Sequence, residues 1–230
     1  MPTIIDEEFG SIVIRRSTRA TQVRLRVAPD GTLRASMPLY APLFLLKRLV
    51  KASRPQLRKM LEQASPVSEY TEGQQIGKSH TLVVRHDTTR LEVKRSKQQI
   101  VVSLPSSKTL ADADVVRMIR DESIAALRLE SKSYLPKRLD YLAKQHGYSY
   151  EKVRFSHASS RWGSCSSTGT ISLNIALMKL PFELIDYVII HELAHTIEMN
   201  HSAAFWARVA EGDSGYILHR RQLKKEAPSI

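Results

Sequence analysis

The chain has 230 residues, of which 42% are hydrophobic and 25% are charged. Such a composition buries a core in one large domain or two small ones, which excludes a disordered or fibrous protein. The formal net charge is +12, and no apolar run of about 18 residues occurs, so we expect no membrane span and no membrane partner.

The cysteine content and the N-terminal segment indicate the compartment. Cys165 is the single cysteine, which excludes an intramolecular disulfide and a disulfide-stapled secreted scaffold. The first residues, MPTIIDEEFGSIVIRR, are acidic before they are basic and lack the apolar core of a secretory signal. We therefore expect a cytoplasmic protein.

The positive charge is concentrated in the N-terminal half. Residues 1–110 carry 19 Lys and Arg against 9 Asp and Glu, whereas residues 111–230 carry 16 against 14. This asymmetry is typical either of a surface that binds nucleic acid or an acidic partner, or of a solvated basic face. The solvated face is favoured, because no helix-turn-helix, zinc-finger or stacking-aromatic pattern accompanies the charge.

The first predicted elements are a β-hairpin and two helices. Over residues 21–37 apolar positions alternate with arginines, and Pro-Asp-Gly supplies a turn, which predicts a hairpin with one buried face. From about 41 to 63 apolar residues recur at helical spacing. Pro55 is expected to divide this stretch into two helices.

A small basic sheet is predicted next. Short strands fall at 81–86, 90–95 and 98–104, and a polar turn at Ser96 and Lys97 joins the last two. No internal repeat is evident in the sequence.

A long helical region follows over 110–146, with a kink expected at Pro136 and a stop at Gly147. Together these elements predict an α+β fold. Its basic, β-rich N-terminal region (1–110), a small antiparallel sheet with helices, is expected to pack with the C-terminal region (111–230) as one unit.

The segment IIHELAHTIEMNH, residues 189–201, predicts a metal site. It lies in an apolar, helical pattern that runs from Pro181 to Met199. On a helix His191 and His195 are one turn apart on one stripe, so both imidazoles can bind one ion. Asn200 tolerates the left-handed conformation that would turn the chain and bring His201 to the same ion.

Glu192 is expected to act on water rather than to bind the metal. It lies about 100° round the helix from His191, where its carboxylate can accept a proton from a zinc-bound water. Glu198, seven residues after His191, is a rival ligand because it returns to nearly the same face. Glu211 is a more distant rival on the next helix.

The alternative reading is a buried helix that happens to be rich in histidine. It is disfavoured because two histidines and a glutamate buried without partners would each cost about 1–3 kcal/mol. A bound metal removes that cost.

Several motifs resemble a known family. HELAH followed by NHSAAFW, and preceded by RWGSCSSTGTISLN and LPFELIDYVIIHELAH, is similar to the YgjP-like metallopeptidases, which are related to the SprT, Spartan and Wss-type zinc proteases. The N-terminal RRSTRATQVRLRVAPDGTLRASMP is similar to that family's opening strands. The resemblance covers about residues 15 to 225. Glu198 in place of a glycine, and the lack of a later methionine, separate the site from metzincins.

The resemblance implies a zincin-like core and a zinc metallopeptidase of the HExxH type that acts on protein or peptide substrates. One Zn²⁺ per chain would be held by His191, His195 and His201, with Glu192 as the catalytic base. A different class of function is a zinc-containing binding module whose basic N-terminal region recognises nucleic acid. The two combine if nucleic acid recruits the protease to its substrates.

Substrate contacts are expected around the motif. The alternating segment from Thr170 to Leu173 predicts a strand that pairs with an extended substrate. Tyr216 and His219 are candidate donors to the oxyanion. Arg161 is a candidate for packing or for substrate contact.

Two further expectations concern packing. Cys165 is expected to be an inert, buried thiol. Ser202 is expected to cap a helix whose Phe205 and Trp206 hold His201 in place.

Overall fold

The computed structural model describes residues 2–27, 32–63, 70–228 and 230. The chain forms two compact units, Met1–Glu69 and Tyr70–Ile230. The structure thus divides the chain after Glu69 and not near residue 110, where the charge distribution suggested a boundary. The prediction that the two regions pack as one unit stays a prediction.

Unit 1 is a four-stranded sheet with two helices. Its strands are β1 (Thr3–Asp6), β2 (Gly10–Ser17), β3 (Arg24–Val27) and β4 (Leu33–Pro38), and its helices are α1 (Leu43–Ala52) and α2 (Arg54–Gln63). The sheet order is β1-β2-β4-β3, with β2 and β4 parallel and the other pairs antiparallel. The helices cover the sheet through one buried cluster, which comprises Ile12, Ile14, Leu33, Ala35, Met37, Leu46, Val50 and Leu57.

The predicted hairpin and the helix break are confirmed in this unit. β3 and β4 pair antiparallel, and Arg24 and Arg26 are exposed as the alternation required. The predicted turn at 28–31 lies outside the described residues. The helices break at Ser53, and Pro55 sits in the first turn of α2, where its missing N–H costs no hydrogen bond.

Unit 2 begins with a second four-stranded sheet, which consists of β5 (Gln75–Ile76), β6 (His80–Arg85), β7 (Glu92–Ser96) and β8 (Gln99–Ser103). Its order, β5-β6-β8-β7, and its pairing directions repeat those of unit 1. The chain therefore contains a repeat of topology that its sequence does not reveal. Lys97, in the predicted turn, has a positive φ of 52°.

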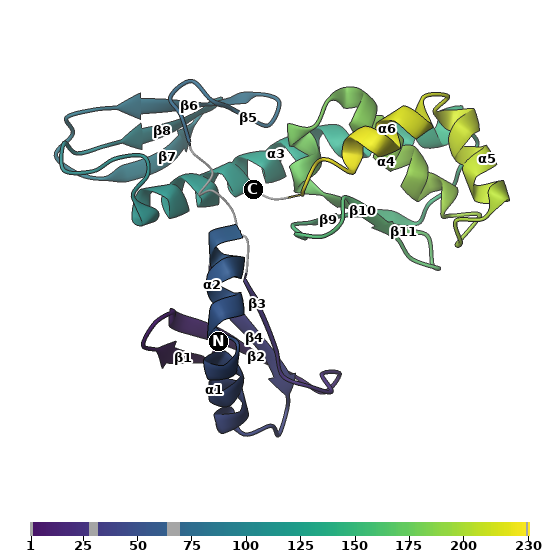
Figure 1. Cartoon of the computed structure of the whole chain (residues 1–230). Coiled ribbons are helices and arrows are strands. Elements are labelled where there is room, and N and C mark those ends of the chain that lie inside the picture. The colour runs from purple at the N-terminus through teal and green to yellow at the C-terminus, as the bar shows by residue number, and fades with distance from the viewer. Residues whose placement is uncertain (1, 28–31, 64–69, 229) are drawn as a thin grey trace. The chain divides into compact units, whose positions relative to one another are not determined.

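Helix α3 (Ala113–Gln145) is the long central helix of unit 2. In Figure 1 it runs along the second sheet and on into the C-terminal elements. Both parts share one core, in which Leu82 and Ile100 of the sheet join Ile119 and Leu127 of the helix. This common core explains why the unit boundary precedes the second sheet. Gly147 follows the helix with φ +69°, as predicted for a helix stop.

The C-terminal elements gather around the second half of α3 (Figure 1). They are β9 (Lys152–Ser156), β10 (Gly163–Cys165), β11 (Thr170–Asn174), the 3-10 helix η1 (Ile175–Lys179), α4 (Phe182–Ala194), α5 (Ala203–Gly212) and α6 (Tyr216–Leu223). The three strands form a small sheet in the order β10-β11-β9. None of the described helices combines the length and the apolar character that crossing a membrane requires.

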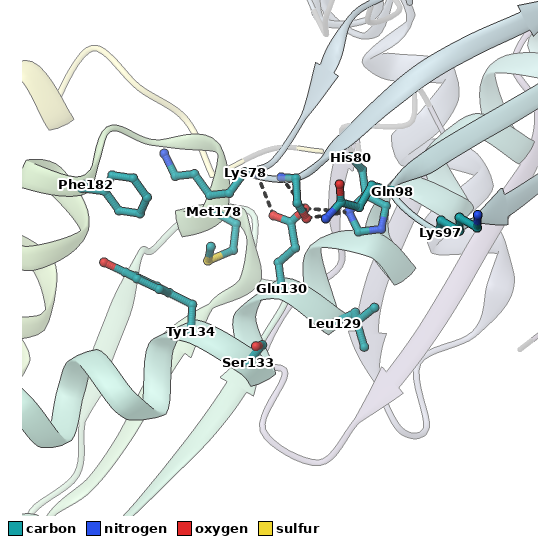
Figure 2. A pocket seen from close by; sticks show the side chains of 11 residues that line it. Lys78, His80, Lys97, Gln98, Leu129, Glu130, Ser133, Tyr134, Met178 and Phe182 are labelled. Atoms are coloured by element: carbon teal, nitrogen blue, oxygen red, sulfur yellow. Dashed lines mark hydrogen bonds and ion pairs between the residues drawn. The ribbon is translucent and has the colours of Figure 1, made fainter.

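A buried carboxylate joins the second sheet to α3. Glu130 is 7% exposed and accepts hydrogen bonds from the backbone N–H groups of Lys78 and Ser79, at 2.7 and 3.0 Å, and from the Ser79 hydroxyl at 2.7 Å. Nδ1 of His80 lies 2.6 Å from the same carboxylate. Figure 2 shows Glu130 turned toward Lys78 and toward His80 at the start of β6, and all three residues line a pocket that Met178 and Phe182 also line.

Candidate metal centre

Helix α4 positions two of the three histidines. Its sequence, FELIDYVIIHELA, is apolar almost all round, and Pro181 precedes it as the N-cap residue. Nine of its residues are buried, so the helix is a core element that fixes any polar side chain it carries. His191 lies in its last turn, and His195 is the C-cap residue, still in right-handed helical conformation.

The helix ends five residues earlier than Met199, where the sequence placed its end. Thr196 donates both its backbone N–H and its hydroxyl to the carbonyl of Leu193, at 2.9 and 2.7 Å. These three-residue hydrogen bonds tighten and end the α-helical ladder. The predicted left-handed turn at Asn200 is wrong, because Asp87 and Lys97 are the only non-glycine residues with positive φ in the described chain.

The structure brings the three histidines together. Their ligand atoms lie within 4.8 Å of one another, and Nε2 of His191 is 3.2 Å from Nε2 of His201. Nδ1 of His195 donates to the carbonyl of Glu198 at 3.0 Å, which leaves its Nε2 free as an acceptor. The cluster could therefore present three nitrogen lone pairs to one ion.

The environment keeps two of these imidazoles neutral. Burial, with smaller effects from the neighbouring histidines and Arg220, lowers the pKa of His191 to about 3. Burial also lowers the pKa of His195. Only a neutral imidazole can donate its lone pair to a metal, so this environment suits a ligand.

Helix α5 packs against the three histidines. Phe205 is fully buried, and its ring centroid lies 4.9 Å from that of His191, 4.4 Å from His195 and 4.8 Å from His201. As predicted, Ser202 caps the helix by accepting from the backbone N–H of Phe205 at 3.2 Å. Trp206 stacks on His201 at 5.6 Å, so the start of α5 fixes the one histidine that α4 does not carry.

Glu192 lies next to His191 in sequence but faces the small sheet. It is 5% exposed, and its Oε2 has no hydrogen-bond partner. Burial raises its pKa to about 8, and the positive charge of Arg161 offsets only part of that effect. A buried carboxyl without donors is poorly stabilised as an anion and is prepared to exchange a proton.

Gly163 makes room for this carboxylate. A Cβ added at Gly163 would lie 2.5 Å from Oε1 and 2.7 Å from Cγ of Glu192, so no side chain fits there without moving the glutamate. The motif RWGSCS contains this glycine, but nothing in the sequence indicates its role. The close approach cannot be read from the sequence because the two positions are 29 apart along the chain.

The expected substrate strand is not available for pairing. The segment from Thr170 to Leu173 belongs to β11, which is the central strand of its sheet, with β10 on one side and β9 on the other. Its backbone groups are therefore already used. β10 is an edge strand, pairs only with β11 in the described chain and packs against α4 at Gly163.

Asn174 is a second residue whose role the sequence did not predict. It is fully buried, and its amide donates to the carbonyls of Ala158 and Arg161, at 2.6 and 2.9 Å. Its carbonyl oxygen accepts from the N–H of Ala176 at 3.0 Å. One side chain thus fixes the loop before β10, and its only signal was a polar residue at the end of an apolar strand.

The remaining predicted site residues interact with three different neighbours. Arg161 acts electrostatically on Glu192. Tyr216 stacks on Trp206 at 5.7 Å. His219 pairs with Asp213 at 2.7 Å.

The rival ligands are not part of the cluster. Among the described residues, the group that could hold an ion comprises His191, His195 and His201, without Glu198 or Glu211. Glu198 takes part through its backbone carbonyl, which accepts from His195. Cys165, expected to be buried, is half-buried, and burial followed by the charge of Glu192 raises its pKa.

Comparisons with known proteins give a family match and a similar solved structure. The model of the YgjP-like metallopeptidase domain matches residues 21–226, which include parts of both units. The chain is similar, at 29% identity and a TM-score of 0.35, to the crystal structure of the metallopeptidase zymogen of Pyrococcus abyssi abylysin. That similarity covers 39% of this chain and 92% of the other. No curated protein matches the chain.

Proposed function

The chain belongs to the YgjP-like metallopeptidase family, and on this premise we propose that it hydrolyses peptide bonds with one Zn²⁺ held by His191, His195 and His201. Glu192 is the general base in this proposal. The observation that carries it is the convergence of three imidazole nitrogens beside a buried carboxylate that lacks a hydrogen-bond donor.

The separations of the imidazole nitrogens support a metal ligand set. Nitrogens at about 2.0–2.1 Å from a tetrahedral zinc lie roughly 3.3 Å from one another. Nε2 of His191 and Nε2 of His201 are 3.2 Å apart. Two neutral imidazoles at this distance can form at most one hydrogen bond between these nitrogens. A cation between them would instead be bound by the lone pairs of both.

The chemistry of the donors favours zinc and an open site. Three nitrogen ligands and a free fourth position are typical of catalytic zinc, whereas structural zinc sites are closed by four protein ligands. His201 is exposed, so a substrate can approach from its side.

Glu192 has the position and the environment of a base. When bound, zinc supplies a Lewis acid that makes water a nucleophile near neutral pH. A cation on the histidines would lower the pKa of the nearby Glu192 carboxyl, which burial, partly offset by Arg161, raises to about 8. Glu192 then accepts the proton of the attacking water and transfers it to the leaving amine.

The edge of β10 is the favoured place for the substrate backbone. An extended peptide can add to an edge strand through main-chain hydrogen bonds, and this edge strand contacts α4 beside Glu192. Of the predicted contact residues, Arg161 is favoured for the substrate because its charge already acts on Glu192. Tyr216 and His219 stay proposals for the oxyanion.

Zinc content and cleavage, measured together, test this function. Protein prepared without chelator should contain about one zinc per chain and cleave peptides of a mixed library. His191→Ala should lose both properties. Glu192→Gln should keep the zinc and lose about 10²- to 10⁴-fold in turnover. A zinc-free wild type, or undiminished cleavage by Glu192→Gln, would remove the assigned roles.

A further inference from the structure

A basic hollow lies beside the histidine cluster. It has a volume of about 480 Å³ and is lined by Trp206 of α5 and by Tyr216, Ile217, Arg220, Arg221 and Lys224 of α6 and its end. In Figure 1 α6 lies next to α4, the helix that carries the HELAH motif. The volume is within the range of about 300–1,000 Å³ that is common for ligand sites.

Stacked rings connect the hollow to the cluster. Trp206 stacks on His201 at 5.6 Å and on Tyr216 at 5.7 Å, with interplanar angles of 24° and 20°. The guanidinium carbon of Arg220 lies 4.4 Å from the centre of the Trp206 ring. The hollow is therefore separated from the exposed ligand His201 by one aromatic side chain, which is a suitable place for a side chain near the scissile bond.

Three positively charged side chains line this hollow. Lys224 caps the C-terminal end of α6 and follows Arg220 by four and Arg221 by three residues, so its side chain is a helical neighbour of both arginines. In the described part of the chain no ion pair joins them to a carboxylate. Stacking on Trp206 fixes Arg220 while the N–H groups in the guanidinium plane stay available to an anion.

The shape of the hollow favours a single carboxylate over a nucleic acid. Single-stranded nucleic acid binds in basic grooves that follow the phosphate backbone over several nucleotides. Here the charges lie within two turns of one short helix, around a hollow that aromatic rings close on one side. A glutamate or aspartate side chain fits this combination of fixed arginine, apolar wall and limited length.

We propose that this hollow is a subsite for an acidic side chain of the substrate, with Arg220, Arg221 and Lys224 as the groups that select it. The proposal rests on the peptidase function and names its substrate class: peptides with a glutamate or aspartate at one fixed distance from the scissile bond. Arg220 binds the carboxylate, while Arg221 and Lys224 add attraction at the rim.

Equilibrium binding tests the subsite separately from catalysis. Zinc-loaded Glu192→Gln protein is titrated with fluorescein-labelled peptides of alanine and leucine that carry one glutamate at a varied position. Each peptide has a matched partner with glutamine there, and fluorescence anisotropy gives Kd. At one position the glutamate peptide should bind about tenfold more tightly than its partner. A ratio near one at every position overturns the proposal.

A charge reversal identifies the residues responsible. Arg221→Glu combined with Lys224→Glu should abolish or invert the preference for glutamate. A matched control, Arg128→Glu with Lys132→Glu, makes the same change of charge at two exposed positions of α3 and should keep the preference. Retention of the preference after the reversal on α6 would overturn the assignment.

Two further outcomes separate the alternatives. If single-stranded DNA binds in a manner that requires Arg221 and Lys224 while acidic peptides do not, the hollow is a nucleic-acid site and the proposal is wrong. If wild-type protein cleaves no peptide although the glutamate preference is present, the peptidase function fails and the subsite stands as a binding site for acidic peptides.

Discussion

Glu130 lies on the long helix α3 and Glu192 on the apolar helix α4, and both are buried, with exposures of 7% and 5%. Burial by itself would raise the pKa of each carboxyl group. At Glu130, however, hydrogen bonds from Lys78, His80 and Ser79 together outweigh burial and lower the pKa below its usual value. At Glu192 no such donors oppose burial, and the pKa rises to about 8.

The two neighbourhoods explain the opposite shifts. The carboxylate of Glu130 accepts from two backbone N–H groups, a hydroxyl and an imidazole, so its anion is solvated by the protein. Around Glu192 the structure places a glycine and leaves Oε2 without a donor. Low solvent exposure by itself therefore does not define the role of a glutamate.

The difference separates a structural carboxylate from a reactive one. A buried polar group whose hydrogen bonds are complete stabilises the fold and has little tendency to change its protonation state. A buried group whose bonds are incomplete lowers stability, and a protein retains it where the chemistry requires it. This contrast supports the assignment of Glu192 as the base and assigns Glu130 to the architecture.

The largest effect that would test the contrast is on stability. Glu130→Ala leaves two backbone N–H groups and two side chains without their acceptor, and it should lower the free energy of unfolding by about 3–5 kcal/mol. For a unit of this size the melting temperature should fall by roughly 10 °C. Both tryptophans, Trp162 and Trp206, belong to unit 2, so their fluorescence reports the unfolding of this unit alone.

Two other substitutions complete this comparison. Glu122→Ala removes a carboxylate from the same helix without a comparable set of donors and should change the free energy of unfolding by less than about 0.5 kcal/mol. Glu192→Gln, measured without metal, should not destabilise the protein, because no hydrogen bond to Oε2 is lost. A loss of several kcal/mol for Glu192→Gln would contradict the distinction between the two glutamates.

The second effect concerns the position of the reactive carboxylate. Gly163→Ala puts a methyl group where Glu192 lies, so the side chain must move. Because a displacement of about 1 Å in an active site can cost about 10²-fold in rate, we expect kcat/KM for peptide cleavage to fall by about tenfold to a hundredfold. Zinc content should stay the same, since the three atoms nearest to the added methyl group all belong to Glu192 and none to a histidine.

Ser164→Ala is the matched control for this substitution. Ser164 is the next residue of β10, and its replacement adds no atom near Glu192, so cleavage should change less than about twofold. If Gly163→Ala and Ser164→Ala had equal effects on cleavage, the close packing of Gly163 on Glu192 would have no part in catalysis.

The local parts of the site were predictable from sequence. His191 and His195 are one helical turn apart, Ser202 precedes an apolar helix, and alternation marked the hairpin of β3 and β4, because each of these patterns lies within a few residues. The strands β1, β2 and β5 were not predicted. His201 was predicted as a third ligand from a left-handed turn at Asn200. The structure places His201 beside the other two histidines, but the turn does not have that geometry.

The non-local parts were not predictable in the same way. The contact of Glu130 with Lys78 joins residues 52 positions apart, and no periodicity links them. Whether Thr170 to Leu173 forms an edge or a central strand depends on the pairing with β9 and β10, which a single segment does not encode. The unit boundary near residue 110 followed from charge, whereas the structure divides the chain by shared core contacts.

The smallest expected effect is on the pH dependence of stability, and it tests the lowered pKa of Glu130. The folded protein holds this carboxylate with a lower pKa than the unfolded chain, whose usual value is 4.5. Its contribution to the free energy of unfolding is thus complete above about pH 4.5 and decreases as the pH falls through the folded-state value. Urea unfolding of wild type and Glu130→Gln, followed by tryptophan fluorescence, should show a constant difference between neutral pH and about pH 5 and a smaller one below. A difference that grew on acidification would mean that the pKa of Glu130 is raised, as at Glu192, and that the two glutamates share one environment after all.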